Sequence, residues 1–96
     1  MFTSTARVPT TRPERYIKQL VSHMGHRATT ELGDDGRGVI TLQHGQCVLT
    51  PSEEHLLMVA TAADAETLAV VQDVIARHLV RFATQEQLTV DWTPTP

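Results

Sequence analysis

The side chains with the clearest capacity for chemistry are the histidines, of which the chain has five. His23 and His26 lie three residues apart on an expected amphipathic helix, residues 16–27. Imidazoles at this spacing lie on adjacent sides of a helix and could share one metal ion. The alternative is that both interact with the helix dipole and the last carbonyl groups. Both interpretations stay open at this point.

Helical geometry makes these two histidines unequal. With Ile17 at the centre of the apolar stripe, His23 lies about 120° round the helix and His26 about 180°. In an unbroken helix His26 would therefore point to solvent. It could turn toward the sheet only if Gly25 ends the helix.

His78 is the third candidate ligand. It lies about 60° from the centre of the apolar stripe of a second expected helix, residues 64–82, and so at the edge of the buried face. If both helices cover one face of a sheet, His78 could meet His23 or His26. Three histidines could form an open metal site for iron or zinc, or supply a haem ligand. The alternative is a partly buried histidine bonded to the backbone.

Cys47, Tyr16 and Arg81 are further candidates. Cys47 alternates with Leu49 on an expected hairpin strand, which favours a buried, structural thiol. Tyr16 and Arg81 together with His23 could supply an acid/base group and an anion clamp for a small enzyme. The sequence contains no CxxC, HExxH, GxSxG or glycine-rich phosphate loop. No catalytic residue is therefore predicted.

Length and charge narrow the functional classes. The 96 residues indicate one domain, residues 1–93, with a disordered tail at 94–96. A net charge of -3 without a basic cluster gives no reason to expect nucleic-acid binding. The chain has one cysteine, no apolar run of membrane-spanning length and no signal peptide, so a cytoplasmic protein is expected.

The elements that must position these residues follow from hydrophobic periodicity. Thr10 or Thr11 should cap the first helix, with Pro13 in its first turn. Two helices with one apolar stripe each require a sheet face to bury them, which predicts an α+β two-layer sandwich of order β-α-β-β-β-β-α-β with a mainly antiparallel sheet. The expected strands are residues 2–8, 28–32, 39–43, 46–50, 56–61 and 88–92. Between them, His44 is expected in a turn and His55 in an exposed loop.

The strand at residues 56–61 carries apolar side chains on both faces. Leu56, Met58 and Ala60 point one way, and Leu57 and Val59 point the other way. This pattern is typical of a central strand, or of a sheet face covered by another subunit. A homodimer formed through the sheet, without a small-molecule ligand, is therefore one of the functional alternatives.

Several long motifs resemble a known family. They are ARVPTxRPxRYxKQLxSHxxHR from Ala6, GxCxL from Gly45, and DAExLxxxQDVIxxHLxRFAxxExLTVDW from Asp64. Together they cover nearly the whole chain and resemble the small bacterial proteins grouped as domain of unknown function 2218. One departure is Gly25, where a helix-favouring residue such as alanine is more usual. The matching motif positions are Arg12, Tyr16, His23, His26, Cys47, His78, Arg81, Phe82 and Trp92.

The resemblance implies an α+β protein with no assigned activity. It also implies an association with siderophore-interacting flavoproteins, which release iron from ferric siderophores. The leading hypothesis is therefore a non-catalytic accessory or binding module, linked to iron or siderophore handling through His23, His26 and His78.

Overall fold

The computed structural model describes residues 1–43, 45–84 and 86–95. The described elements follow the predicted order, β-α-β-β-β-β-α-β, and form an α+β fold. They are β1 (Phe2–Pro9), α1 (Pro13–Met24), β2 (Thr29–Leu32), β3 (Gly38–Thr41), β4 (Gly45–Pro51), β5 (His55–Ala62), α2 (Ala65–Phe82) and β6 (Thr93–Thr95).

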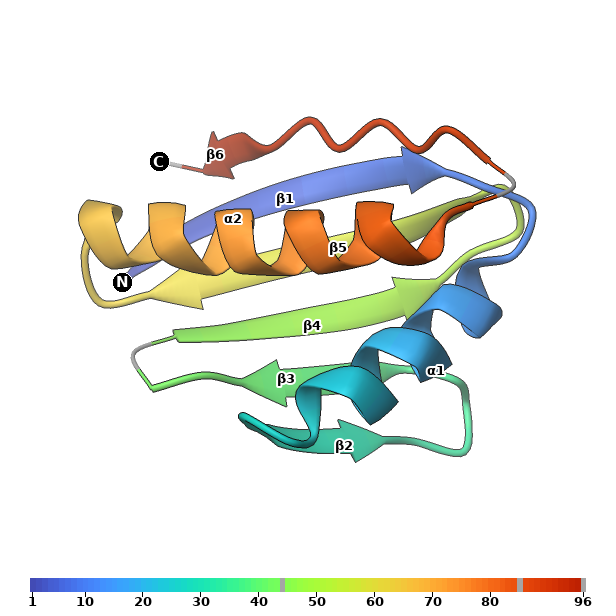
Figure 1. The fold of residues 1–96 in the computed structure, drawn as a ribbon. Helices are drawn as coiled ribbons and strands as arrows, with labels where there is room; N and C mark the ends of the chain where they lie inside the picture. Colours follow the sequence, from blue (N-terminus) through green and yellow to red (C-terminus); the bar gives the residue numbers. More distant parts are fainter. Residues whose placement is uncertain (44, 85, 96) are drawn as a thin grey trace.

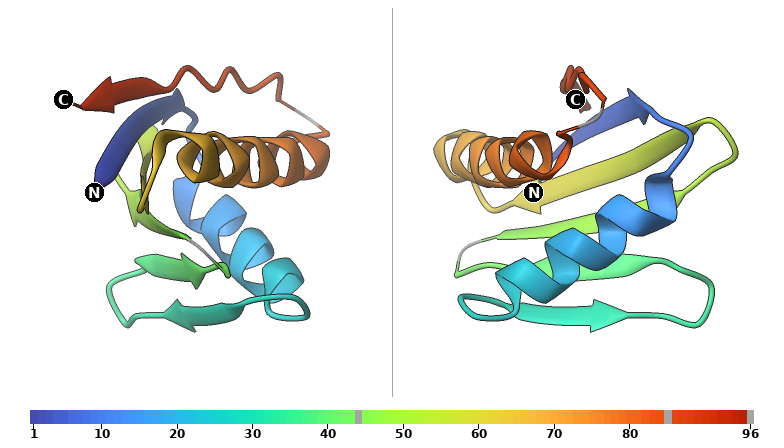
Figure 2. Two further views of the ribbon diagram at one scale, coloured as in Figure 1. Left: turned by 90° about the vertical axis from the view of Figure 1, so that its left-hand side faces the viewer. Right: turned by 45° about the vertical axis from the view of Figure 1, so that its right-hand side comes forward.

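The strands form one open sheet in the order β2-β3-β4-β5-β1-β6, and all its neighbouring strands are antiparallel. Both helices lie on the same face of this sheet (Figure 1). The two turned views in Figure 2 show the same two layers, with α1 and α2 side by side. This arrangement confirms the predicted sandwich and leaves the opposite sheet face without a helix.

Strand alternation explains which sheet face is the core. Along β5, Leu56, Met58 and Ala60 are fully buried beneath the helices, while Leu57 and Val59 on the other face are only partly buried. The helices contribute matching stripes, because an apolar residue at every third or fourth position stays on one side. Fully buried members of these stripes are Ile17 and Leu20 in α1 and Ile75 and Leu79 in α2.

Two glycines allow the helices to approach the sheet closely. A Cβ atom at Gly38 in β3 would lie 2.9 Å from a methyl carbon of Ile17, which is on α1. A Cβ atom at Gly45 in β4 would lie 2.6 Å from a methyl carbon of Val71, which is on α2. Real side chains do not tolerate such distances without movement, so each helix packs over a position where no side chain is present.

The ends of α1 differ from the prediction. Arg12 occupies the N-cap position and makes no side-chain capping bond. Thr10 does not cap the helix, because its hydroxyl group is bonded to Glu86 and to the Arg12 backbone N–H. Helix α1 ends at Met24, and Gly25 keeps right-handed backbone angles as the chain enters a turn. Helix α1 therefore begins and ends three residues earlier than residues 16–27, with Pro13 in its first turn as predicted.

The C-terminal segment also differs. The last strand, β6, pairs Thr93–Thr95 with β1, later in the chain than the predicted residues 88–92. Residues 94 and 95, which the sequence assigned to the tail, therefore belong to the sheet. Leu88 is buried, and Val90 and Trp92 pack against the core without ladder pairing, because apolar alternation specifies a face and not a strand partner.

Two smaller expectations concern histidines. His55 begins β5 and is partly buried, whereas the sequence placed it in an exposed loop. The predicted turn at His44 lies outside the described residues. Among the described helices, none is both long enough and apolar enough to span a membrane.

Candidate functional site

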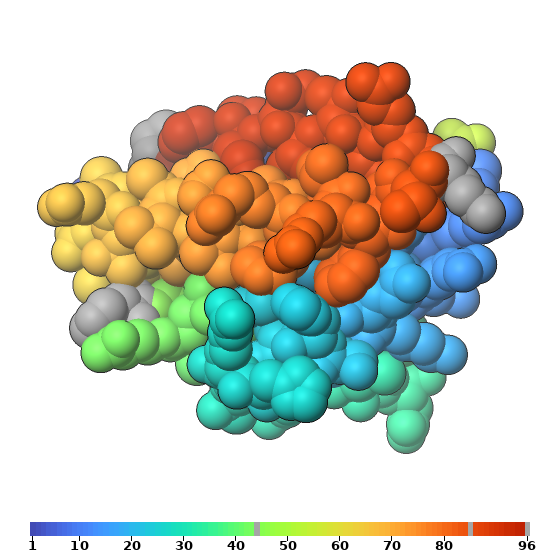
Figure 3. All heavy atoms as spheres, in the orientation of Figure 1, coloured from blue at the N-terminus to red at the C-terminus, as the bar shows by residue number. Residues whose placement is uncertain are grey.

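The rings of His23 and His78 meet where α1 and α2 lie side by side. Their centroids are 5.0 Å apart, and the ring planes are inclined at 43°. Phe82, one turn further along α2, packs edge-on against His23 at a centroid distance of 5.3 Å. The space-filling view in Figure 3 shows the later half of α2 in orange directly against α1 in blue and cyan. Of the two contacts that the sequence left open for His78, with His23 or with His26, the structure shows the one with His23.

The hydrogen bonding of His78 determines which nitrogen remains available. Its Nδ1 lies 2.7 Å from the carbonyl oxygen of Val74, one turn earlier in α2. Because a carbonyl oxygen can only accept, Nδ1 carries the proton and donates it. In the neutral ring Nε2 then has a free lone pair. A backbone carbonyl on the other nitrogen is a usual partner of metal-binding histidines.

His23 is surrounded by positive charge. Packing of its ring against neighbouring side chains removes water from an otherwise exposed residue, and this desolvation is the first cause that lowers the pKa of His23. The charges of His78, Arg27, Arg81 and His26 lower the pKa of His23 further. The neutral imidazole, which is the form that binds metals, is thus favoured.

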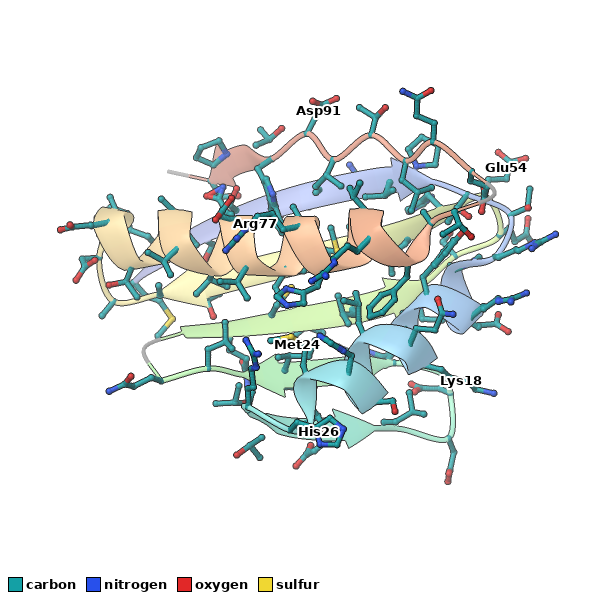
Figure 4. The ribbon with its side chains drawn as sticks, viewed as in Figure 1. Lys18, Met24, His26, Glu54, Arg77 and Asp91 are labelled. Carbon is teal, nitrogen blue, oxygen red and sulfur yellow. The ribbon has the colours of Figure 1, made fainter. Side chains whose placement is uncertain are left out.

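His26 does not complete a three-histidine centre. It follows the end of α1, is exposed, and lies on the side away from α2 (Figure 4). Across the part of the chain that the structure describes, no three His, Cys, Asp or Glu side chains are close enough to hold one metal ion. The expected cluster of His23, His26 and His78 is therefore reduced to the pair His23 and His78, because His26 stays exposed even though helix α1 ends at Met24.

A shallow hollow of about 440 Å³ opens beside the pair. Its walls combine basic, neutral polar and aromatic side chains. They are Lys18, Gln19, Ser22, His23, His26 and Phe82. The Oε1 atom of Gln19 is buried and has no hydrogen-bond partner among the described residues. The hollow thus places polar side chains next to His23, whereas His78 does not line it.

A second polar cluster lies at the opposite end of α1. The Tyr16 hydroxyl donates to Glu86 Oε2 at 2.6 Å, and the Thr10 hydroxyl donates to the same carboxylate at 3.0 Å. The hydrogen bond to Glu86 is the first cause that raises the pKa of Tyr16, and the bond from Tyr16 is the first cause that lowers the pKa of Glu86. Through these hydrogen bonds, the segment after α2 is held against the start of α1.

Sequence reasoning missed Glu86. Tyr16 and Glu86 are 70 residues apart, and no periodic pattern connects them. The sequence did point to Glu86 in one way, because the family motif FAxxExL specifies a glutamate at this position. Because Tyr16 is bonded to Glu86 and does not line the hollow, the enzyme constellation of Tyr16, His23 and Arg81 is not assembled there.

Cys47 is fully buried in β4, as predicted. Burial raises the pKa of its thiol to about 12. The thiolate, which is the nucleophilic form, is therefore negligible at neutral pH. Cys47 is a core residue in this fold.

Comparison with known proteins agrees with this fold. The family model described as uncharacterised proteins conserved in bacteria, domain of unknown function 2218, matches residues 5–93. The NMR structure of PA4090 from Pseudomonas aeruginosa is 38% identical, covers 97% of this chain and 96% of its own, and superposes with a TM-score of 0.80. No curated protein matches the chain. The chain therefore belongs to the bacterial family designated domain of unknown function 2218.

Proposed function

We propose that this protein is a non-catalytic binding module that takes a metal ion between His23 and His78. The observation that carries the proposal is the 5.0 Å distance between the two ring centroids. At a metal–nitrogen distance of about 2.1 Å, two imidazoles that share one ion have ring centres roughly 5 Å apart. Small rotations of the exposed His23 ring would bring a nitrogen of each ring to one ion.

The environment of the pair favours such a role. His78 is already oriented by its bond to the Val74 carbonyl, so its Nε2 position is fixed before binding. The surroundings of His23 lower its pKa, which favours the neutral imidazole. Imidazole is a suitable ligand for iron, zinc, copper and nickel. Iron is the member of this set that agrees with the expected link to iron or siderophore handling.

Two protein ligands leave coordination positions open. Such a site suits transfer or temporary storage better than a structural role, because structural zinc sites use four protein ligands. A siderophore-interacting flavoprotein is a proposed partner on the same grounds as iron, since it would release the ion that the module receives. This association remains a proposal about the chain.

The test is metal titration of the protein without an affinity tag. Zn²⁺ and Co²⁺ are titrated into wild type and into His23→Ala/His78→Ala, and the Co²⁺ absorption bands report coordination. The double variant should lose binding. His55→Ala is the matched control, because His55 lies on the opposite sheet face and should bind as wild type. Haem is titrated in parallel. Equal metal and haem binding in wild type and double variant would contradict the proposal.

A second candidate function is a homodimer formed through the uncovered sheet face. Val39, Val48 and Val59 are direct neighbours across β3, β4 and β5, and all three are partly exposed. An apolar row of this kind on an open sheet face suits packing against a second sheet. Val48→Glu should convert a dimer to a monomer in light scattering at micromolar concentration. A wild-type protein that is already monomeric rules this candidate out.

A further inference from the structure

The last strand uses only part of the edge that β1 offers. Strand β6 pairs its three residues with Thr3–Thr5, whereas β1 continues to Pro9. In the described part of the chain, no backbone hydrogen bond joins residues 6–9 of β1 to residues 88–92. Figure 2 shows the segment before β6 crossing from the helix layer to the edge of the sheet. The second half of β1 is therefore left without a partner on this side.

The β1–β6 register indicates which residues would pair if β6 were longer. The next partners would be Ala6 with Trp92, Arg7 with Asp91 and Val8 with Val90. The exposure of the side chains already fits this register, because Arg7 and Asp91 are exposed, whereas the β1 members of the other two pairs are buried and their partners pack against the core. Extending β6 would thus keep each side chain on its present face.

The backbone of Arg7 points toward this unpaired segment. The Thr10 N–H donates to the Glu54 carbonyl, which continues the β1–β5 register by one position. In an antiparallel pair, every second residue directs both its N–H and its C=O toward the same neighbour. Even-numbered residues of β1 therefore face β5, and odd-numbered residues face β6. Since Pro9 has no N–H, Arg7 is the position in β1 where both backbone groups remain open among the described residues.

A slot of about 410 Å³ opens at this place on the outer sheet face. Its lining residues are Thr5, Arg7, Asp91, Thr93 and Thr95. Arg7 and Asp91 have opposite charges and form no salt bridge in the described structure. Opposite charges that face each other across two strands favour pairing, and open backbone groups at a strand edge favour it further.

We propose that residues 89–92 form a strap that closes onto β1 and lengthens β6. In the closed state, Arg7 and Asp91 exchange two backbone hydrogen bonds and the slot disappears. In the open state, which the structure shows, the N–H and C=O of Arg7 are accessible to another extended chain. The strap thus controls access to the β1 edge. Its closure involves neither His23 nor His78 and does not depend on the metal site.

Both ends of the strap are held in place. Glu86 accepts hydrogen bonds from Thr10 and Tyr16 before it, and β6 is paired with β1 after it. Leu88 is buried. In the continued register Leu88 would lie opposite Thr10, which is already bonded to Glu86, so closure leaves these bonds intact. Only the few residues between the two anchors need to move.

The first test traps the closed state with a disulfide. Directly opposed, hydrogen-bonded residues of an antiparallel pair have Cα atoms about 5.5 Å apart, a distance that a disulfide can bridge. Arg7→Cys/Asp91→Cys is equilibrated with reduced and oxidised glutathione, and mass spectrometry after alkylation gives the fraction with an intramolecular disulfide. Cys47 does not compete, because it is fully buried.

Two matched pairs set the scale of this measurement. Thr5→Cys/Thr93→Cys joins residues that are already paired. Arg7→Cys/Thr89→Cys joins residues two positions out of register, whose Cα atoms would stay about 7–8 Å apart, too far for a disulfide. The effective thiol concentration of Arg7→Cys/Asp91→Cys should exceed that of the out-of-register pair about tenfold or more. Its ratio to the paired control gives the fraction of closed strap. A value no higher than that of the out-of-register pair would overturn the proposal.

Hydrogen exchange followed by NMR tests whether the trapped form is the paired strand. In the oxidised Arg7→Cys/Asp91→Cys protein, the amide at position 7 should exchange about tenfold or more slowly than in the reduced protein, because only closure gives it an acceptor. The amides of Ala6 and Val8 face β5, should be protected in both forms and show that the fold is intact. If the amide at position 7 exchanges equally fast in both forms, the disulfide has formed without the ladder and the strap proposal is wrong.

Discussion

The two ends of helix α1 carry polar clusters of opposite kind. At its first turn, Tyr16 and Thr10 donate hydrogen bonds to the Glu86 carboxylate, so donors and an anion are both supplied by the chain. At its last turn, His23 meets His78 within a group of positive side chains. The first cluster is complete and connects segments of the fold. The second cluster keeps an imidazole nitrogen of His78 available for a ligand, which is why the candidate site is placed there.

The same helix therefore carries a satisfied structural cluster and the proposed binding pair only about two turns apart. Polar groups that satisfy one another stabilise a fold, and groups that remain unsatisfied are more often functional. Variants in the middle and at each end of α1 test whether the two clusters are independent.

The largest expected effect comes from the middle of the helix. Leu20 is fully buried between the two clusters, and Leu20→Ala should lower the free energy of unfolding by about 2–5 kcal/mol. Because α1 would then pack less firmly on the sheet, both the hydrogen bond from Tyr16 to Glu86 and the contact between His23 and His78 should weaken. Urea unfolding and Zn²⁺ titration measure the two effects. The matched control is Leu32→Ala, since Leu32 is 45% exposed and should change stability little.

A smaller effect is expected at the first turn. Tyr16→Phe removes the hydroxyl that donates to Glu86 and should lower the free energy of unfolding by about 1 kcal/mol, because Thr10 still bonds to the partly exposed carboxylate. Zn²⁺ binding should stay at the wild-type level. If metal affinity fell as far as in His23→Ala, the two ends of α1 would not be independent.

The first cluster should also respond to pH. The pKa of Glu86 is lower in the folded protein than in the unfolded chain, so its contribution is present above about pH 4.3 and is lost as pH falls through the folded value. Glu86→Gln should therefore be less stable than wild type at pH 7, and the gap should narrow below about pH 4. Urea midpoints at several pH values measure the gap. A constant gap would mean that the charge of Glu86 has no part in it.

The raised pKa of Tyr16 has the opposite consequence. Its contribution is present below about pH 10, the unfolded value, and is lost as pH rises through the folded value. Wild type should therefore lose more stability than Tyr16→Phe at strongly alkaline pH. Equal losses of stability in wild type and Tyr16→Phe would mean that ionisation of Tyr16 does not weaken the fold through its bond to Glu86.

The smallest effect on stability is expected at the last turn. His23 is exposed by area, and His23→Ala removes no hydrogen bond that the structure shows. The urea midpoint should not shift measurably at pH 7.5, while Zn²⁺ binding is lost. A large fall in the midpoint would show that the histidine pair is structural, like the cluster at the first turn.

Much of this molecule could be predicted from local patterns. Helical stripes correctly identified α1, α2 and their buried residues, and alternation correctly placed the two faces of β5. The start of α2 near residue 64 and the burial of Cys47 were also predicted from single residues and their neighbours. The errors concern the start of α1, where Arg12 lies at the N-cap in place of Thr10 or Thr11, and the last strand, because the segment 88–92 lacks a strong local preference.

What the sequence by itself determined was the type of each element, the order of the elements and the side of each element that is buried. These follow from periodicity, which acts between residues a few positions apart. Only the tertiary structure decided that His23 meets His78 and that Tyr16 meets Glu86. Both contacts depend on where two helices lie across the sheet, which is set by the insertion of β1 between β5 and β6 and by the close packing over Gly38 and Gly45. Such placement arises from contacts far apart in the chain, so no local pattern contains it.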